Sequence, residues 1–86
     1  MIQKDYFPNG NIREEGLIIE GIKHGLWIEY YPAGNIKVKK KYESGKKHGE
    51  FEYFKDNGDI DFKVNYNMGE IITSKLNFNK IIKRNN

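Results

Sequence analysis

Two histidines are the residues best suited to metal chemistry. His24 and His48 each precede a glycine, and they lie one sequence repeat apart. Equivalent positions in adjacent β-hairpins are two strand spacings apart, about 9–10 Å. Two nitrogen ligands of one zinc ion must approach to within about 3.5 Å of each other, and no third ligand recurs nearby. We therefore expect no metal and no other cofactor, and we interpret each His-Gly pair as the start of a strand.

The carboxylates do not form a catalytic pattern. Glutamates are scattered along the chain, and no nucleophile elbow, zinc-protease helix motif or phosphate-binding loop occurs. A single sheet also lacks a deep, water-excluded cleft that could raise a carboxyl pKa for acid–base catalysis. Glu29, beside Trp27 and Tyr31, is expected to pair with a lysine on a neighbouring strand. The sequence thus predicts a protein that is not an enzyme.

Lysines give the chain a net charge of +3. The excess is centred on residues 39–41 and 46–47, but Glu15 and Asp61 interrupt the same side of the expected strands. A groove that follows nucleic-acid phosphates needs one sign of charge and interleaved aromatic rings, so we expect no nucleic-acid partner. An anionic membrane surface stays open as an alternative. Its candidate contacts are Lys39, Lys41, Lys46 and Lys47.

Aromatic residues are the positive evidence for binding. The candidate partner-binding residues are Trp27, Tyr30, Tyr31, Phe51, Tyr53 and Phe54. Strand alternation places rings on both sides of the sheet. One side is expected to pack on a core made of Ile12, Ile36, Val38, Ile60 and Phe62. The rings either form ladders that hold a thin sheet together or leave an exposed patch for a partner.

Positioning of these residues follows from a 24-residue internal repeat. Two glycine series show it, namely Gly10, Gly34 and Gly58, and Gly21, Gly45 and Gly69. Several series at one offset indicate a repeat architecture. We expect a single domain over residues 1–86, with units at about 6–29, 30–53 and 54–78, followed by a tail at 79–86.

Each unit is predicted to form one β-hairpin. Residues 36–42 alternate between apolar and lysine side chains, which is the period of a half-buried strand. Residues 43–47 supply a turn around Gly45, and residues 50–54 supply an aromatic-rich strand. The predicted fold is all-β: a single-layer antiparallel meander of six or seven strands, ordered in space as in sequence. Gly25 and Gly49 recur at one strand start, where positive φ or close backbone approach favours glycine.

These units resemble the MORN-repeat family, in particular its bacterial variant. The resemblance rests on residues 30–37 (YYPAGNIK) and 42–51 (YESGKKHGEF), and residues 6–13 and 21–27 repeat it. The third unit departs from the pattern, because Ile72-Thr73 replace His-Gly. The resemblance implies a sheet curved into an open trough.

The same resemblance implies two classes of function. Similar bacterial proteins are labelled as antitoxin or immunity-like partners of toxins, whereas eukaryotic relatives use such repeats near membranes or for dimerisation. We expect a non-catalytic protein-binding module, and the resemblance implies an antitoxin or immunity-type partner protein as its finer form. The alternative is peripheral binding to anionic lipid.

Composition and size indicate where the protein is located and whether it associates. No apolar run approaches the ~20 residues of a membrane span, no secretory signal opens the chain and cysteine is absent, so we expect a cytoplasmic protein. A one-layer sheet this small leaves edges and one face open, which predicts a weak homodimer or an obligate partner. The segment containing Leu76, Phe78, Ile81 and Ile82 is the alternative cover.

Overall fold

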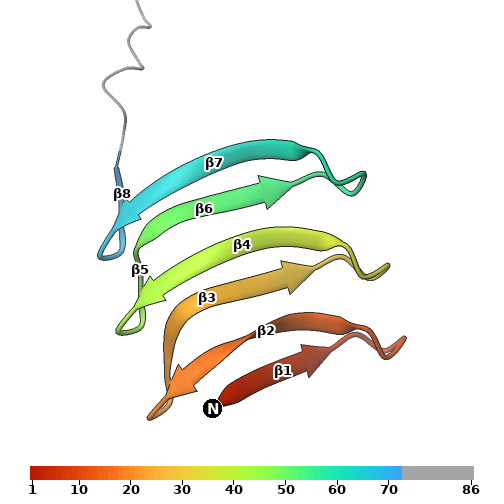
Figure 1. Ribbon diagram of the computed structural model, residues 1–86, viewed down its shortest axis with the longest axis horizontal. Helices are drawn as coiled ribbons and strands as arrows, with labels where there is room; N and C mark the ends of the chain where they lie inside the picture. The colour runs from red at the N-terminus through yellow and green to blue at the C-terminus, as the bar shows by residue number, and fades with distance from the viewer. Residues whose placement is uncertain (73–86) are drawn as a thin grey trace, which may run out of the picture.

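The computed structural model describes residues 1–72 as one antiparallel sheet (Figure 1). Its strands are β1 (Ile2–Tyr6), β2 (Ile12–Ile19), β3 (Ile22–Tyr30), β4 (Ile36–Glu43), β5 (Lys46–Lys47), β6 (Gly49–Phe54), β7 (Ile60–Asn67) and β8 (Glu70–Ile72). Their order in space is β1-β2-β3-β4-β6-β7-β8, and β5 pairs with β4. The molecular extents are 49 × 33 × 13 Å, so the sheet is a single layer. The described residues form no helix that could span a membrane.

The predicted all-β meander is confirmed, with one difference in strand number. Eight strands replace the expected six or seven, because the strand that begins the second half of the middle unit is broken at His48 into β5 and β6. The predicted cover by residues 76–82 lies outside the described residues.

Tight turns at one end of the sheet share one geometry. Each has two consecutive residues with positive φ: Glu20 and Gly21, Ser44 and Gly45, and Met68 and Gly69. Two-residue hairpin turns of this kind match the right-handed twist of the strands that they join. The turns at the other end also repeat, with one backbone hydrogen bond of 2.8 Å recurring in each, as from the Tyr31 amide to the Asn35 carbonyl.

A β-bulge recurs at the start of the first strand of every unit. The register shifts between Glu29 and Tyr30 so that Glu29 faces Val38 and Tyr30 faces Ile36, leaving Lys37 as the extra residue. A bulge moves the following side chains to the opposite face. Ile36 therefore does not join Val38. The expectation that the three repeat isoleucines share a core with Val38 and Phe62 is wrong for this reason, since the same shift occurs in the other two units.

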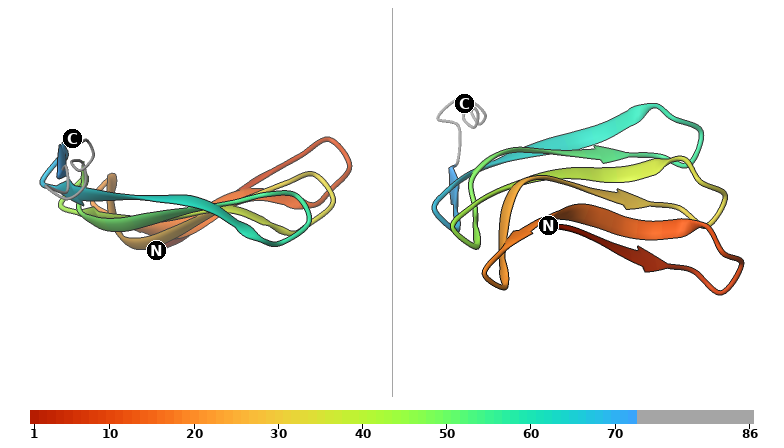
Figure 2. Two further views of the ribbon diagram at one scale, coloured as in Figure 1. Left: turned by 90° about the horizontal axis from the view of Figure 1, so that it is seen from above. Right: turned by 60° about the horizontal axis from the view of Figure 1, so that its bottom comes forward.

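The sheet bends sharply at the His-Gly pairs. Gly25 has φ +69° and Gly49 has φ +98°, as the sequence pattern predicted. Figure 1 shows β3 turning near its start, and the break between β5 and β6 lies at the equivalent place one repeat later. Figure 2 shows that the strand ends at this side curve out of the plane of the sheet. The bend therefore turns these ends of the strands out of the plane of the sheet.

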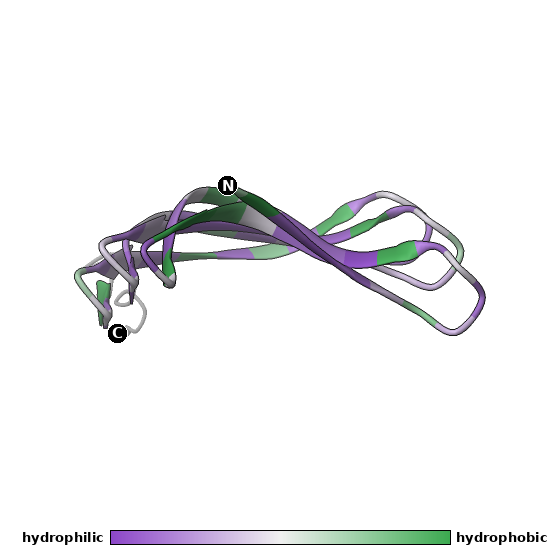
Figure 3. Cartoon of the chain, turned by 90° about the horizontal axis from the view of Figure 1, so that it is seen from below, coloured by the Kyte–Doolittle hydropathy of each residue, from purple (hydrophilic) through white to green (hydrophobic). Residues whose placement is uncertain are grey.

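The core is small and lies on one face. Trp27, Val38 and Phe51 are its buried hydrophobic residues. Gly16 makes room for the Trp27 ring, because a Cβ at Gly16 would lie 2.1 Å from Cδ2 of Trp27. Figure 3 shows hydrophobic and hydrophilic residues alternating along the strands, as expected for a sheet whose two faces differ.

Candidate binding surface

Directly opposite residues in the strand register share a face, so the pairings define two surfaces. The first, here called the aromatic face, includes Glu14, Trp27, Glu29, Val38, Lys40, Phe51, Tyr53, Phe62 and Val64. The second, here called the ladder face, carries the row Lys4, Glu15, Ile28, Lys39, Glu52 and Lys63, one residue from each strand that crosses it. The candidate residues from the sequence divide between these faces.

Two of the proposed contact residues are part of the core. Trp27 and Phe51 are each 1% exposed. The Lys23 ammonium lies 4.5 Å from the Trp27 ring centroid, and the Lys47 ammonium lies 5.7 Å from that of Phe51. The Trp27 indole N–H also donates a 3.0 Å hydrogen bond to the Leu17 carbonyl. The interpretation of Trp27 and Phe51 as surface contacts is therefore corrected: lysine stems and ammonium groups cover both rings.

An ion cluster occupies the N-terminal half of the aromatic face. The Lys40 ammonium lies 2.6 Å from a Glu14 carboxylate oxygen and 3.3 Å from a Glu29 oxygen. Glu29 thus has the cross-strand lysine partner that the sequence predicted. Burial raises the pKa of Glu14, but the Lys40 hydrogen bond and the charges of nearby cations outweigh burial and hold this pKa below its usual value. Lys23 lies 3.8 Å from the same Glu14 oxygen, so two lysines balance the two carboxylates of the cluster.

The C-terminal half of the same face is apolar and open. The Tyr53 and Phe62 rings stack with centroids 4.5 Å apart and an interplanar angle of 14°. Phe62 is 51% exposed, although it lies within β7. The residues that lie directly opposite one another on this face form a row across the sheet. Its chemical character changes from the acidic Glu14 and Glu29 to the apolar or aromatic Val38, Tyr53 and Phe62. The sequence pattern predicts Tyr53 as a contact residue and Phe62 as a core residue, because alternation alone does not show which strand lacks a neighbour.

The ladder face carries opposite charges on neighbouring strands. Lys63 lies 3.7 Å from Glu52 and 3.9 Å from Glu50. The Tyr30 hydroxyl donates a hydrogen bond to Glu15. Burial, together with this contact to a carboxylate, raises the pKa of Tyr30 to about 12. Glu15, Glu50, Glu52 and Lys63 therefore have partners on this face.

The three repeated hairpins correspond to a known repeat family. A family model described as MORN repeat variant matches residues 1–19, 23–44 and 47–68. The chain belongs to this MORN repeat family. Each matched stretch contains two neighbouring strands and the turn between them. Comparisons with curated proteins and with solved structures gave no match.

The lysines proposed as anion contacts do not gather on one side of the MORN sheet. Lys39 and Lys41 alternate with Lys40 and so lie on the ladder face, and Lys46 faces Glu43 there. Lys47 lies on the aromatic face, where its ammonium is 5.0 Å from the Tyr66 ring centroid. Glu50 and Glu52 share the ladder face with the first three lysines. The result is a surface of mixed sign.

Two other candidate aromatics connect neighbouring MORN units. The Tyr31 hydroxyl donates a 2.6 Å hydrogen bond to the Phe54 carbonyl. The Lys39 ammonium lies 5.7 Å from the Phe54 ring centroid on the ladder face. Both rings are half-buried, so their main contribution is to join units.

His48 forms a hydrogen bond with the backbone of the MORN sheet. Nδ1 of His48 accepts a 3.2 Å hydrogen bond from the Met68 amide of the next unit. Within residues 1–72, no three His, Asp or Glu side chains converge in an arrangement that would hold a metal ion.

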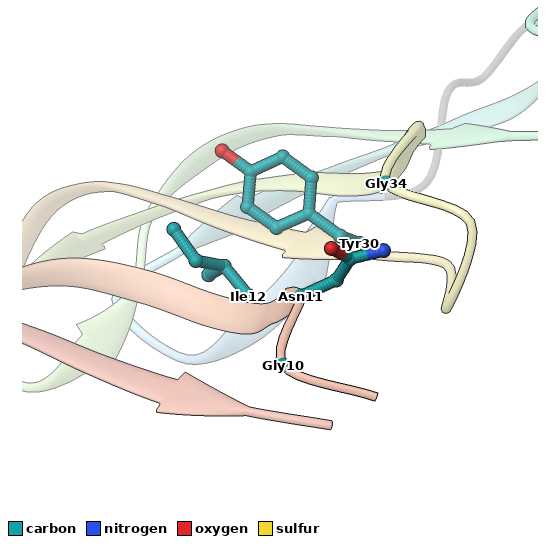
Figure 4. A pocket seen from close by; sticks show the side chains of 5 residues that line it. All are labelled: Gly10, Asn11, Ile12, Tyr30 and Gly34. Carbon is teal, nitrogen blue, oxygen red and sulfur yellow. The ribbon is translucent and has the colours of Figure 1, made fainter. Parts of the chain in front are cut away.

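A hollow of about 320 Å³ lies beside the turns at the opposite end of the sheet (Figure 4). Gly10, Asn11, Ile12, Tyr30 and Gly34 line it. The Asn11 side-chain amide is already used, because it donates a 2.8 Å hydrogen bond to the Pro32 carbonyl of the next unit. The Tyr30 hydroxyl at this hollow is engaged as well, because it donates a hydrogen bond to Glu15.

Proposed function

We propose that this MORN repeat chain is a non-catalytic protein-binding module whose main contact is the Tyr53–Phe62 stack. The exposure of Phe62 carries the proposal. A ring that is half exposed in a strand gains little from the fold and offers apolar area to a partner. MORN repeats generally lack catalytic activity and commonly bind proteins or membranes.

The position of the stack suits protein recognition. Aromatic anchors dominate the energetics of many interfaces, and they work best on rigid elements. Tyr53 and Phe62 stand on paired strands, with Val38 beside them in the register. A partner therefore meets a preformed apolar contact, and little side-chain ordering opposes binding.

The resemblance to antitoxin and immunity-type proteins supplies the finer form of this proposal. A protein of that kind acts by occupying a surface of its target and needs no catalytic group. A preformed sheet face with an aromatic anchor is compatible with that role.

Binding to anionic lipid receives less support. A peripheral site for lipid headgroups needs several cations on one surface, each contributing about 1 kcal/mol. The four candidate lysines divide between two faces, and three of them share their face with glutamates. Salt-sensitive cosedimentation with phosphatidylserine vesicles would favour lipid over protein as the partner.

Affinity capture from the native cell, comparing matched variants, tests the proposed function. Phe62→Ala removes the anchor from the aromatic face. Ile60→Ala is the matched control, because Ile60 is 50% exposed on the same strand but faces the other way. We expect one protein to be retained by wild type and Ile60→Ala and lost from Phe62→Ala. Equal retention by all three, or no retained protein at low salt, would refute the role of the stack.

A further inference from the structure

The edge of β7 is open along half of the strand. β6 pairs with β7 on one side from Ile60 to Tyr66. On the other side, β8 pairs with residues 65–67 only. Within the described part of the chain, residues 60–64 therefore present an unpaired strand edge, a form of backbone that readily accepts another strand.

The repeat itself shows what fits such an edge. β4 is the counterpart of β7 one repeat earlier, and its equivalent edge is covered by β6. There, Tyr53 lies opposite Val38 on the aromatic face, and Glu52 lies opposite Lys39 on the ladder face. The 24-residue offset places Phe62 and Lys63 at the positions of Val38 and Lys39. The matching strand thus has an acidic residue opposite Lys63 and an aromatic residue opposite Phe62.

A second copy of this chain fits the edge poorly. Its own free edge strand, β1, corresponds by the same offset to β6. Continuing the sheet from copy to copy would place Lys4 opposite Lys63 and Asp5 opposite Phe62. Like charges directly opposite each other destabilise a strand pair, and a carboxylate gains nothing from facing an exposed ring. The charges at the two edges therefore disfavour head-to-tail stacking.

We propose that the β7 edge binds an extended segment of another protein by strand addition, and that this segment contains an acidic residue followed by an aromatic residue. The strand runs antiparallel to β7, with its carboxylate at Lys63 and its ring on Phe62. Backbone hydrogen bonds to residues 60–64 supply affinity, and the two side chains fix the register. This inference rests on the proposed function and defines the chemistry of the partner.

Lys63 is suitably placed for this role. Its side chain is 45% exposed, and its contacts to Glu50 and Glu52 are long at 3.9 and 3.7 Å. These carboxylates come from the β6 side, so the approach from the open edge is free of an acidic partner among residues 1–72. A carboxylate bound at this position continues the alternation of acidic and basic residues on neighbouring strands of the ladder face.

A peptide copied from this chain can be used to test binding at the β7 edge. A synthetic peptide with the sequence of residues 48–55, HGEFEYFK, carries the Glu-Tyr pair that covers β4. The control peptide has Glu52→Lys, which reverses the charge that meets Lys63 and preserves the remaining residues. Binding of each peptide to the full chain is followed by NMR shifts and amide hydrogen exchange. We expect the acidic peptide to bind about two- to fivefold more tightly than the control and to slow exchange at residues 60–64.

A protein variant tests the charge contact. Lys63→Gln should bring the two peptide affinities to within about 1.5-fold of each other, because the residue that distinguishes them has lost its charge. Lys55→Gln is the matched control, since it removes the same charge from an exposed turn. It should leave the discrimination unchanged.

Three results would overturn the inference. Protection, in the free full chain with neither peptide bound, of the amides of residues 60–64 that point away from β6 would assign the edge to the chain's own residues 73–86. Equal affinity for both peptides in wild type would remove the role of Lys63. Shifts at Tyr53 and Phe62 without protection of the β7 backbone would leave the proposed face contact in place and refute strand addition.

Discussion

The Trp27 ring packs directly on the backbone of Gly16. The indole covers Gly16 so closely that any Cβ there overlaps the ring. A one-layer sheet has no second layer that could bury a large side chain. For the single tryptophan of the chain, the contact with Gly16 provides part of that burial.

Gly16→Val is expected to destabilise the fold by about 3 kcal/mol, because the new side chain occupies the space of the Trp27 ring. A smaller ring suggests a rescue, because Phe51 occupies the position of Trp27 one repeat later and is equally buried. Gly16→Val combined with Trp27→Phe should therefore be more stable than Gly16→Val alone, measured by urea unfolding followed by circular dichroism. A double variant less stable than the single one would contradict this packing account.

The Lys40 cluster makes stability depend on pH. The pKa of Glu14 is lowered in the folded state, so its contribution is present above the unfolded pKa and is lost as pH falls through the folded value. Lys40→Met should cost about 2 kcal/mol at pH 7, because it removes the lysine of Glu29 and leaves Glu14 with the longer 3.8 Å contact to Lys23. The cost should shrink toward pH 3, as the carboxyl of Glu14 becomes protonated and no longer needs the cation. Urea unfolding at both pH values checks this, with the exposed Lys41→Met as control; a cost independent of pH would exclude the cluster as its source.

At the scale of elements, the His-Gly bend and the bulge decide the shape of each hairpin. The bend curves the strand ends, and the bulge sends Ile36 to the ladder face. At the 24-residue offset the bulge recurs three times and the His-Gly bend twice, so neighbouring MORN units repeat the same departures from a regular ladder.

Gly49→Val should destabilise the sheet by more than about 1 kcal/mol, since a β-branched residue is strained at φ +98°. The new Cβ would also lie 3.3 Å from Cδ of Lys41. Ala33→Val, in an exposed turn without positive φ, is the control and should change stability little. Thermal unfolding compares the two, and an unchanged melting temperature for Gly49→Val would show that the bend tolerates a side chain.

At the scale of the whole molecule, the sheet is a one-dimensional array. Strands β3 and β4 are paired on both sides, whereas β1 is paired on one side and β7 is paired incompletely among the described residues. In such arrays, stability comes from each unit and from its contacts with neighbours.

Amide hydrogen exchange should therefore form a gradient. We expect the slowest exchange in β3 and β4, and faster exchange in β1 and at residues 60–64 of β7, because the end strands open without disrupting the centre. Exchange measured residue by residue by NMR provides the test. Uniform protection from β1 to β7 would indicate a single cooperative unit or edges covered in solution.

The sequence by itself determined the repeat, the strands, the turns and the membership in the MORN family. These follow from local rules: alternation marks a strand, and glycines at fixed spacing mark turns and bends. The lysine partner of Glu29 was also predictable, because it depends on neighbouring strands in a simple meander.

Only the tertiary structure decided which faces these side chains share. One bulge residue per unit reverses the side of an isoleucine, and no local signal distinguishes Lys37 from its alternating neighbours. Trp27 and Phe51 are buried because strand ends, lysine stems and a distant glycine surround them, whereas Phe62 is exposed because the neighbouring strand covers only part of β7. Burial depends on contacts between units, and the sequence of one strand does not contain that information.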